Sequence, residues 1–229
     1  MAHRTFGYVT TFCSEAAAAM PARYRDARAG LRLGVVDTTV DHVPANAASY
    51  EIGDDLALVP TWGMFAVTDA LMGHWGVSID ELVATASGNV TALPAERSTH
   101  HSGEATVEAV IGHHWVSSLI VDIARSSRGE DGFLVAVPRS DVMAVTPVVG
   151  VETLDGLDAL IAISEGLYDP DDLGISPHVW WWFQGAYRRV TDHTEGGSLD
   201  FLHHTNLSAF YLARAIEHLA GPCIECGRE

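Results

Sequence analysis

The residues of this sequence that are best suited to metal chemistry lie near the C-terminus. His193 is followed two residues later by Glu195, and a Pro-Cys-x-x-Cys motif with the thiols of Cys223 and Cys226 comes after an interval. One imidazole and two thiolates are a ligand set that holds zinc. A glutamate beside such an ion can accept and donate protons. One prediction is therefore a zinc site formed by His193, Cys223 and Cys226, with Glu195 as general acid and base.

The order of these residues is similar to that of zinc-dependent nucleobase deaminases, which release ammonia from an amidine-like carbon. In those enzymes the His-x-Glu motif starts one helix and the Cys pair opens another. Here one long helix is predicted to fill the interval between the two motifs. Three alternatives stay open for the Cys pair: a structural zinc site, a redox-active Cys-x-x-Cys motif or a terminal segment without chemistry.

Other reaction types are excluded by composition. All 13 basic residues are arginine, whereas Schiff-base catalysis and the P-loop use a lysine amine. Gly-x-Ser-x-Gly and Gly-x-Gly-x-x-Gly motifs are absent as well. The 12 histidines include three adjacent pairs, but neighbouring residues point to different sides of a helix or strand. The pairs alone therefore predict no metal site; they are His100-His101, His113-His114 and His203-His204.

Net charge and cysteine content limit the partners and the compartment. The formal charge is −17, which repels phosphate backbones and anionic lipid headgroups, so we expect binding neither to nucleic acid nor to membranes. No apolar run approaches the length of a bilayer span. The three cysteines cannot form a fully paired secreted framework, and no signal peptide pattern opens the chain. We therefore expect a cytoplasmic protein.

Three consecutive tryptophans mark a second candidate site. Trp180, Trp181 and Trp182 cannot all face one core if they lie on a strand, because alternate side chains point to opposite faces. At least one should be exposed, covered by a helix, or part of a pocket. With Arg188 on the following strand, they are candidate residues for binding a ligand or a protein partner, and we expect Trp181→Ala or Trp182→Ala to weaken that binding without unfolding the chain.

The elements that must position these residues follow from periodicity and capping. We predict helices at 16–29, 68–75, 78–89, 116–125, 154–167 and 198–220, and strands at 31–39, 56–61, 105–111, 133–137 and 142–149. A hairpin is predicted for 180–190 around Gln184-Gly185-Ala186. This mixture, without strict alternation of strands and helices, predicts an α+β fold with a mixed, mostly antiparallel sheet packed by helices, together with the long C-terminal helix. We expect a single domain, 1–229, that ends in a Cys-x-x-Cys tail at 221–229.

Residues 30–190 resemble the YtpQ-like family of bacterial proteins of unknown function. The resemblance lies in the order of WGVSIDELVATASGNV, HHWVSSLIVDIA, GFLVAVPRSDVMAV and ISPHVWWWFQGAY. The matching positions would be Asn89, Ser117, Pro138 with Arg139 and Asp141, and Ser176 with Val179. The sequence departs from the family pattern by Ser140 between Arg139 and Asp141, and by the histidine-rich C-terminal region. The resemblance implies a fold for 30–190 but no activity.

Two hypotheses of different class follow. The first is a ligand- or protein-binding, regulatory module that uses the tryptophan strand, with a small molecule or a protein as partner. The second is a zinc-dependent hydrolase of the deaminase type that uses His193, Glu195, Cys223 and Cys226. The sequence decides neither the ligand nor the oligomeric state.

Overall fold

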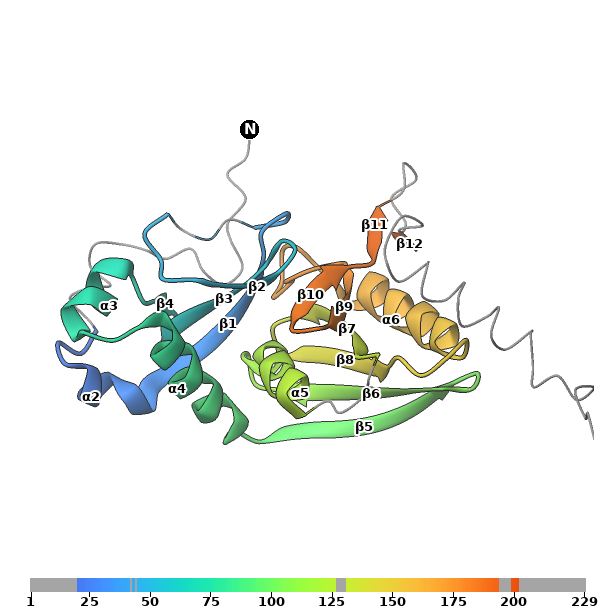
Figure 1. The fold of residues 1–229 in the computed structure, drawn as a ribbon, viewed down its shortest axis with the longest axis horizontal. Coiled ribbons are helices and arrows are strands. Elements are labelled where there is room, and N and C mark those ends of the chain that lie inside the picture. The colour runs from blue at the N-terminus through green and yellow to red at the C-terminus, as the bar shows by residue number, and fades with distance from the viewer. Residues whose placement is uncertain (1–19, 42, 44, 127–130, 194–198, 202–229) are drawn as a thin grey trace, which may run out of the picture.

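The structure, a computed structural model, describes residues 20–41, 43, 45–126, 131–193 and 199–201. These residues form a mixed ten-stranded sheet with helices on both faces (Figure 1). The strand order is β1-β3-β2-β10-β9-β7-β8-β6-β5, with β4 paired to β3. The pairings within this sheet are antiparallel, except that β10 runs parallel to β2. The predicted α+β fold with a mostly antiparallel sheet is therefore confirmed.

The element bounds are as follows. The first half contains α2 (Tyr24–Ala27), the 3-10 helix η1 (Arg28–Gly30), β1 (Leu31–Asp37), β2 (Tyr50–Gly53), β3 (Leu56–Trp62), β4 (Phe65–Ala66), α3 (Asp69–Trp75), α4 (Ile79–Thr91) and β5 (Ala95–Ser102). The second half contains β6 (Ala105–Gly112), the 3-10 helix η2 (Val116–Leu119), α5 (Ile120–Ser126), β7 (Phe133–Arg139), β8 (Val142–Pro147), α6 (Thr153–Leu167), β9 (Val179–Phe183) and β10 (Ala186–Arg189). A separate two-stranded sheet pairs β11 (Thr191–His193) with β12 (Leu199–Phe201).

Local capping sets the ends of α3 and α4 where the sequence predicts them. The Thr68 side chain accepts a hydrogen bond from the Leu71 backbone, and Gly76 ends α3 in the left-handed conformation with φ 68°. The Ser78 side chain likewise accepts a hydrogen bond from the Glu81 backbone at the start of α4. A side-chain oxygen at this position satisfies a backbone donor that the helix leaves unpaired. Helix α4 is thereby held at a fixed start beside the sheet.

The predicted hairpin is formed by β9 and β10. Gln184 and Gly185 connect the two strands with positive φ angles of 50° and 86°. Two consecutive residues with positive φ are typical of the tight turn whose twist matches that of the flanking strands. Strand β7 differs from the prediction, because it continues through Pro138 to Arg139. The register of β7 with β8 shifts between Ala136 and Arg139, and such an irregularity accommodates a proline that cannot donate a hydrogen bond.

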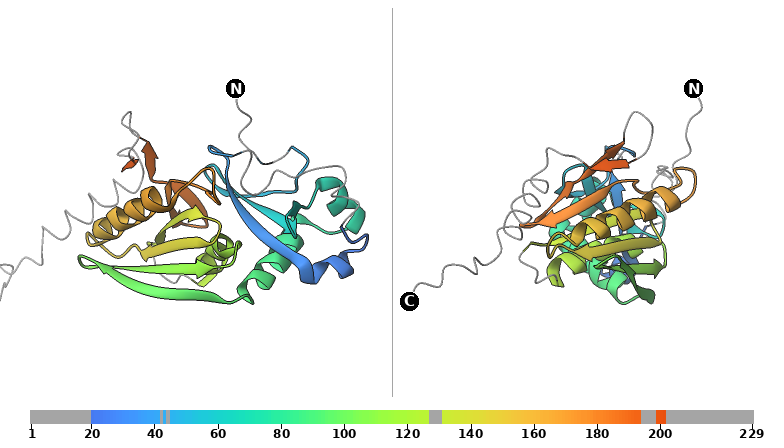
Figure 2. Two further views of the ribbon diagram at one scale, coloured as in Figure 1. Left: turned by 180° about the vertical axis from the view of Figure 1, so that it is seen from behind. Right: turned by 90° about the vertical axis from the view of Figure 1, so that its right-hand side faces the viewer.

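Helices α4 and α6 cover the sheet (Figure 2), and an apolar cluster packs beneath each of them, on opposite faces of the sheet. On one face, Leu82, Val83 and Ala86 of α4 pack with Ile120 and with residues of β1, β3, β7 and β8. On the other face, Leu157 and Leu160 of α6 pack with residues of β6, β7, β8 and β9. Alternate residues of β7 enter alternate clusters, as a strand buried on both faces requires.

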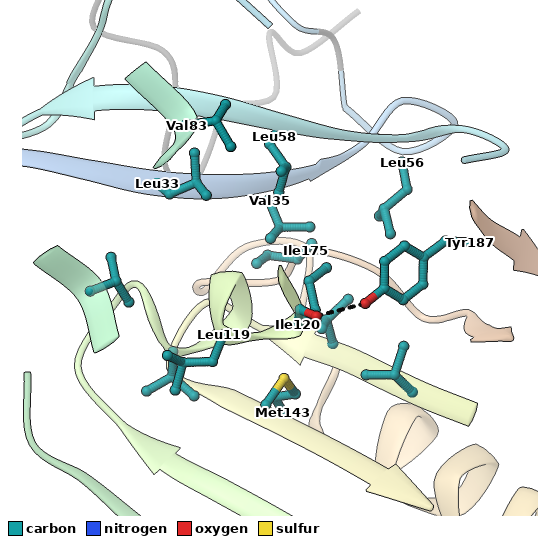
Figure 3. Packing of buried hydrophobic residues seen from close by; sticks show 14 of the residues in the cluster. Leu33, Val35, Leu56, Leu58, Val83, Leu119, Ile120, Met143, Ile175 and Tyr187 are labelled. Carbon is teal, nitrogen blue, oxygen red and sulfur yellow. Dashed lines mark hydrogen bonds between the residues drawn. The ribbon is translucent and has the colours of Figure 1, made fainter. Parts of the chain in front are cut away.

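The sheet bends around η2 and the start of α5. Figure 3 shows β1 and β3 on one side of this helical segment and the strands that carry Met143 and its neighbours on the other. The Tyr187 hydroxyl of β10 donates a buried hydrogen bond of 2.8 Å to the Ile120 carbonyl in the middle of this core (Figure 3). Burial raises the pKa of Tyr187 far above its usual range, so the phenol stays a neutral donor. The bend brings β2 and β10 together at the centre of the sheet.

Further elements differ from the sequence predictions. Of the helix predicted for 16–29, the described residues 20–23 are not helical, and helical structure begins at Tyr24. Strands β2 and β5 were not predicted, because neither shows the apolar alternation of a half-buried strand. The long helix predicted for 198–220 does not start as expected, since Leu199–Phe201 form β12 and pair with β11. At these three residues, pairing with a neighbouring strand has overridden the local preference for a helix. The rest of the predicted helix, 202–220, lies outside the described residues. None of the helices in the described ranges has both the length and the apolar character needed to cross a bilayer.

Candidate functional site

A groove opens where the two halves of the sheet meet. Strands β2 and β10 share a single register pair, Tyr187 with Gly53, and the Asp54 backbone donates a 2.9 Å hydrogen bond to the Tyr187 carbonyl. Gly53 is required for this approach, because a Cβ atom there would overlap the Tyr187 backbone. Next to this contact the groove extends between the two segments. It is lined there by residues 50–52 of β2 and by Gly185 and Ala186 of the β9–β10 hairpin.

The groove has the size and lining of a small-molecule site. Its volume is about 690 Å³, within the range of about 300–1,000 Å³ that is usual for ligand pockets. Its walls come from β2, the β9–β10 hairpin, α4 and α5, and most of the lining side chains are apolar or aromatic. The apolar and aromatic members are Tyr50, Ile52, Leu58, Val83, Ala84, Val121, Ala124, Trp182, Ala186 and Tyr187.

The Trp182 indole forms a flat part of the wall of this groove. It is half-buried, and its ring stacks on Phe133 with centroids 5.5 Å apart and an interplanar angle of 11°. Phe133 in turn makes an edge contact with Tyr187 at 6.1 Å. This aromatic packing holds the indole from the core side, so its exposed part is presented in a fixed orientation. The Trp182 indole therefore offers an ordered platform for an apolar ligand.

Charged side chains at the groove are mostly acidic. Glu51 and Asp80 are exposed lining residues and carry two negative charges. Arg125 is the basic lining residue, and its guanidinium lies 3.7 Å from the carboxylate of Asp122. Part of the positive charge is therefore offset within α5. The groove as a whole favours a cation over an anion.

The structure places the tryptophans predicted as binding residues in three different environments. Trp180 is fully buried in the cluster below α4 and α5, and Trp181 is 2 % exposed in the cluster below α6. The Trp181 indole donates a 2.8 Å hydrogen bond to the Asp131 carbonyl and stacks on Phe183. Their burial removes both residues from any binding surface. Trp182 alone of the three lines the groove.

Other predicted site residues do not join the groove. Arg188 is exposed and follows Tyr187 on β10, so it points to the opposite face of the sheet. His193 ends β11, and Glu195, Cys223 and Cys226 lie outside the described residues. Among the described residues, no group of three or more His, Cys, Asp or Glu side chains could hold a metal ion. The zinc site at His193, Cys223 and Cys226 stays a prediction.

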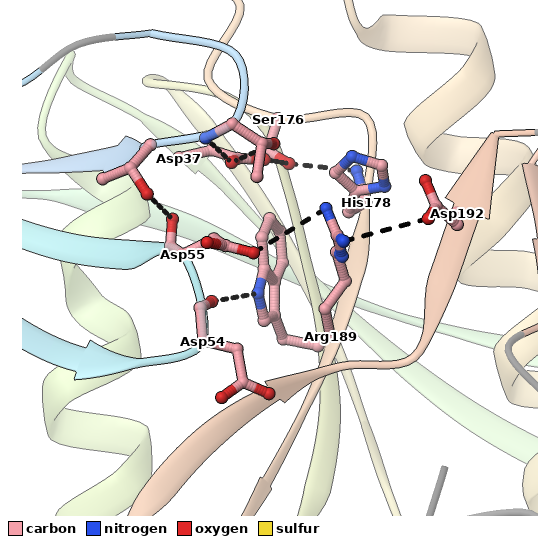
Figure 4. A network of polar contacts seen from close by, with 10 residues as sticks. Asp37, Asp54, Asp55, Ser176, His178, Arg189 and Asp192 are labelled. Atoms are coloured by element: carbon pink, nitrogen blue, oxygen red, sulfur yellow. Dashed lines mark hydrogen bonds and ion pairs between the residues drawn. The ribbon is translucent and has the colours of Figure 1, made fainter. Parts of the chain in front are cut away.

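A buried polar network lies beside Asp54 and Asp55, in the turn between β2 and β3 (Figure 4). The Asp37 carboxylate is fully buried and accepts a 2.5 Å hydrogen bond from the Ser176 hydroxyl. The same carboxylate accepts hydrogen bonds from the Thr39 backbone and hydroxyl at 2.9 and 2.6 Å. Although Asp37, Ser176 and His178 are residue types found in hydrolases, the His178 contact to Ser176 is made by its backbone N–H. The network therefore links β1 to the segment before β9 and is not a nucleophile with its base.

A second cavity is small and lies beside His114 and Trp115. Its volume is about 40 Å³, and the hydroxyls of Thr61, Ser117 and Ser140, which have no hydrogen-bond partner among the described residues, belong to side chains that line it. Such a volume suits a solvent-sized molecule and no larger ligand. The pKa of the nearby His113 is lowered. The main cause is burial, and the electrostatic effects of Arg32 and then of His114 add to it. His113 is therefore a neutral side chain at physiological pH.

The residues of the groove were missed by the sequence predictions, apart from Trp182. Val83, Ala84, Val121 and Ala124 look like ordinary members of apolar helix stripes, and β2 was not recognised. No family model matches this chain, and comparisons with curated proteins and with solved structures found no match. The resemblance of residues 30–190 to the YtpQ-like family stays a prediction.

Proposed function

We propose that this protein is a binding module for a small amphipathic ligand that has a flat apolar body and a positively charged group. The observation that carries the proposal is the groove of about 690 Å³ between the β9–β10 hairpin, β2, α4 and α5, with Trp182 held flat at its wall. Ligand sites are usually concave and apolar with a few polar groups that fix the orientation. The groove has these properties.

The apolar part of the ligand would lie against the aromatic side chains. Trp182 and Tyr50 line the groove from β9 and β2, and Val83 and Val121 line it from the helices. An aromatic ring prefers an offset stack or an edge contact with such side chains, and each such contact stabilises a complex by about 0.5–1.5 kcal/mol beyond its area. A flat ring system therefore gains more here than a branched aliphatic group of equal size.

The charged part of the ligand would be an ammonium or a similar cation. Glu51 and Asp80 attract a cation, whereas the basic side chain of the groove, Arg125, lies beside Asp122. Exposed opposite charges contribute about 0.2–1 kcal/mol each. Aromatic faces also attract cations, which adds to the same preference. The net charge of −17 acts in the same direction over the whole surface.

We also propose that the module is a binding protein of the cytoplasm. The sparse cysteines support the cytoplasmic assignment. The acidic composition supports the absence of nucleic acid and anionic membranes among its partners. A regulatory role would follow from the position of the groove at the junction of the two halves of the sheet, because a ligand there would contact β2, β10 and both helices at once.

A titration with matched probes tests the proposal. Naphthylmethylamine and naphthoic acid share one flat ring system and differ in the sign of their charge. We expect calorimetry to show binding of the amine, and binding of the acid at least about fivefold weaker, as the two carboxylates imply. Equal affinity for the two probes, or binding of the acid alone, would refute the proposed ligand class.

Two variants separate groove binding from binding elsewhere. Ala84 is exposed on α4 and lines the groove, so Ala84→Arg adds bulk and positive charge there and should reduce amine affinity about tenfold or more. Ala162 is exposed on α6 and does not line the groove, so Ala162→Arg is the matched control with unchanged affinity. If both variants bind the amine like the unaltered protein, the groove is not the binding site.

A further inference from the structure

The last strand of the sheet has an open edge. Strand β5 pairs with β6 over eight consecutive residues without a register shift. Its other edge has no strand partner in the described part of the chain, and β5 forms the rim of the molecule in Figure 1. No residue of β5 is buried. Within the described part of the chain, the backbone donors and acceptors along this edge therefore have no strand to pair with.

Several devices that usually block such edges are missing from β5. The strand contains no proline, its pairing with β6 has no bulge, and the whole chain has no lysine. Natural sheets use these devices to prevent association through their edges. The charge of Arg97 is already engaged, since its guanidinium lies 2.5 Å from the Glu108 carboxylate of β6. The edge itself is thus left suited to pairing with another strand.

We propose that two copies of this chain associate by antiparallel pairing of β5 with β5, centred on Ser98. A two-fold axis perpendicular to the sheet leaves every side chain on its own face of the sheet. Because residues opposite each other in an antiparallel pair point to the same face, the axis must pass between a residue and the same residue of the other copy. The result is a continuous sheet that runs through both molecules. Closed two-fold pairing also removes the exposed edge from both copies.

The polar side chains of β5 favour this register. With the axis at Ser98, the Glu96 carboxylate of each copy lies opposite the His100 imidazole of the other copy. The dimer therefore contains this pair twice. Centring on Thr99 instead places Glu96 opposite Ser102, and centring on His100 leaves Glu96 facing the β5–β6 turn of the other copy, beyond the end of its strand. A carboxylate that faces an imidazole N–H donor forms a favourable cross-strand pair, whereas two carboxylates that face each other destabilise it. The Ser98 hydroxyl and the His100 imidazole lie 2.9 Å apart, which orders His100 for the contact.

Sedimentation velocity at increasing protein concentration tests the association. We expect reversible dimers in the unaltered protein and an affinity about tenfold lower in His100→Glu, because two carboxylate–carboxylate pairs replace two carboxylate–imidazole pairs. The exchange variant Glu96→His with His100→Glu should restore the affinity to within about threefold. His74 is exposed on α3, so His74→Glu is a control with the same change of net charge and unchanged association.

Cross-linking tests the register independently. In a chain with Cys13, Cys223 and Cys226 replaced by serine, Ser98→Cys places a thiol on the axis, where cross-strand Cα atoms are about 5 Å apart and can form a disulfide. His101→Cys is the control on the same strand, because six residues, or about 20 Å, separate its counterpart from the residue opposite. Monomers at all concentrations, or equal cross-linking of both variants, would overturn the proposal.

Discussion

Trp181→Ala should lower the free energy of unfolding by about 3–5 kcal/mol, whereas Trp182→Ala should lower it by about 1–2 kcal/mol. Trp181 is 2 % exposed, packs below α6 with Leu157 and Leu160, and loses both its stack on Phe183 and its hydrogen bond to Asp131. Trp182 is half-buried, and the cavity left by its truncation opens into the existing groove. The structure thus separates two residues that look equivalent in the sequence.

Urea denaturation of the two variants measures this difference, and amine affinity gives an opposite ranking. Trp182→Ala should weaken binding of naphthylmethylamine about tenfold, because the platform of the groove is lost. Trp181→Phe is a control that keeps an aromatic ring in the α6 cluster and should recover most of the lost stability. A larger loss of stability in Trp182→Ala than in Trp181→Ala would contradict the placement of these side chains.

Asp37→Ala is expected to cost about 2–4 kcal/mol of the free energy of unfolding. The carboxylate is fully buried and accepts hydrogen bonds from Ser176 and from both the backbone and the hydroxyl of Thr39. Its removal leaves these donors in a buried place without their acceptor, and each such loss costs about 1–3 kcal/mol before relaxation. The Ser176 bond also connects β1 with the segment that leads into β9 (Figure 4).

Ser176→Ala and Asp37→Asn divide this cost. Ser176→Ala removes one donor and should cost about 1 kcal/mol. Asp37→Asn retains one carbonyl oxygen for Thr39 but turns an amide donor toward the Ser176 hydroxyl or the reverse, so we expect an intermediate loss. Urea denaturation of the three variants gives the order. A change of less than about 0.5 kcal/mol in Asp37→Ala would show that the network does not hold the two segments together.

Local signals in the sequence were sufficient to predict the elements whose ends are set by their own capping and turn residues. Thr68 and Gly76 bound α3, Ser78 starts α4, and the Gln184-Gly185 turn connects β9 with β10, each as predicted. These features depend on hydrogen bonds and backbone angles within a few residues. For the same reason the apolar strands β1, β3, β6, β7 and β8 could be recognised from their residues alone.

Elements defined by distant partners could not be recognised in this way. Strand β5 has no buried residue and β2 reaches only half-burial, so neither carries the period of a half-buried strand. Residues 199–201 have the pattern of a helix start but pair with β11. Alternation correctly indicated that the three tryptophans cannot face one core. It could not indicate that α6 covers the second face and buries Trp181.

The groove depends on the meeting of segments that are far apart in the sequence. Gly53 and Tyr187 bring β2 and β10 together, and α4 and α5 close the other walls. Each lining residue has an ordinary type at an ordinary position, so no motif marks the set. The motif that stands out in the sequence, at His193, Glu195, Cys223 and Cys226, extends beyond the described residues.

Chemical-shift mapping by nuclear magnetic resonance during titration with naphthylmethylamine tests the binding site most directly. We predict the largest changes at the Trp182 indole N–H and at the backbone amides of Tyr50, Ala84 and Ala124, which line the groove from four different elements. The indole N–H of Trp181, buried below α6, should remain unchanged. Changes centred on α6 or β5, or none at saturating amine, would contradict the assignment of the groove as the binding site.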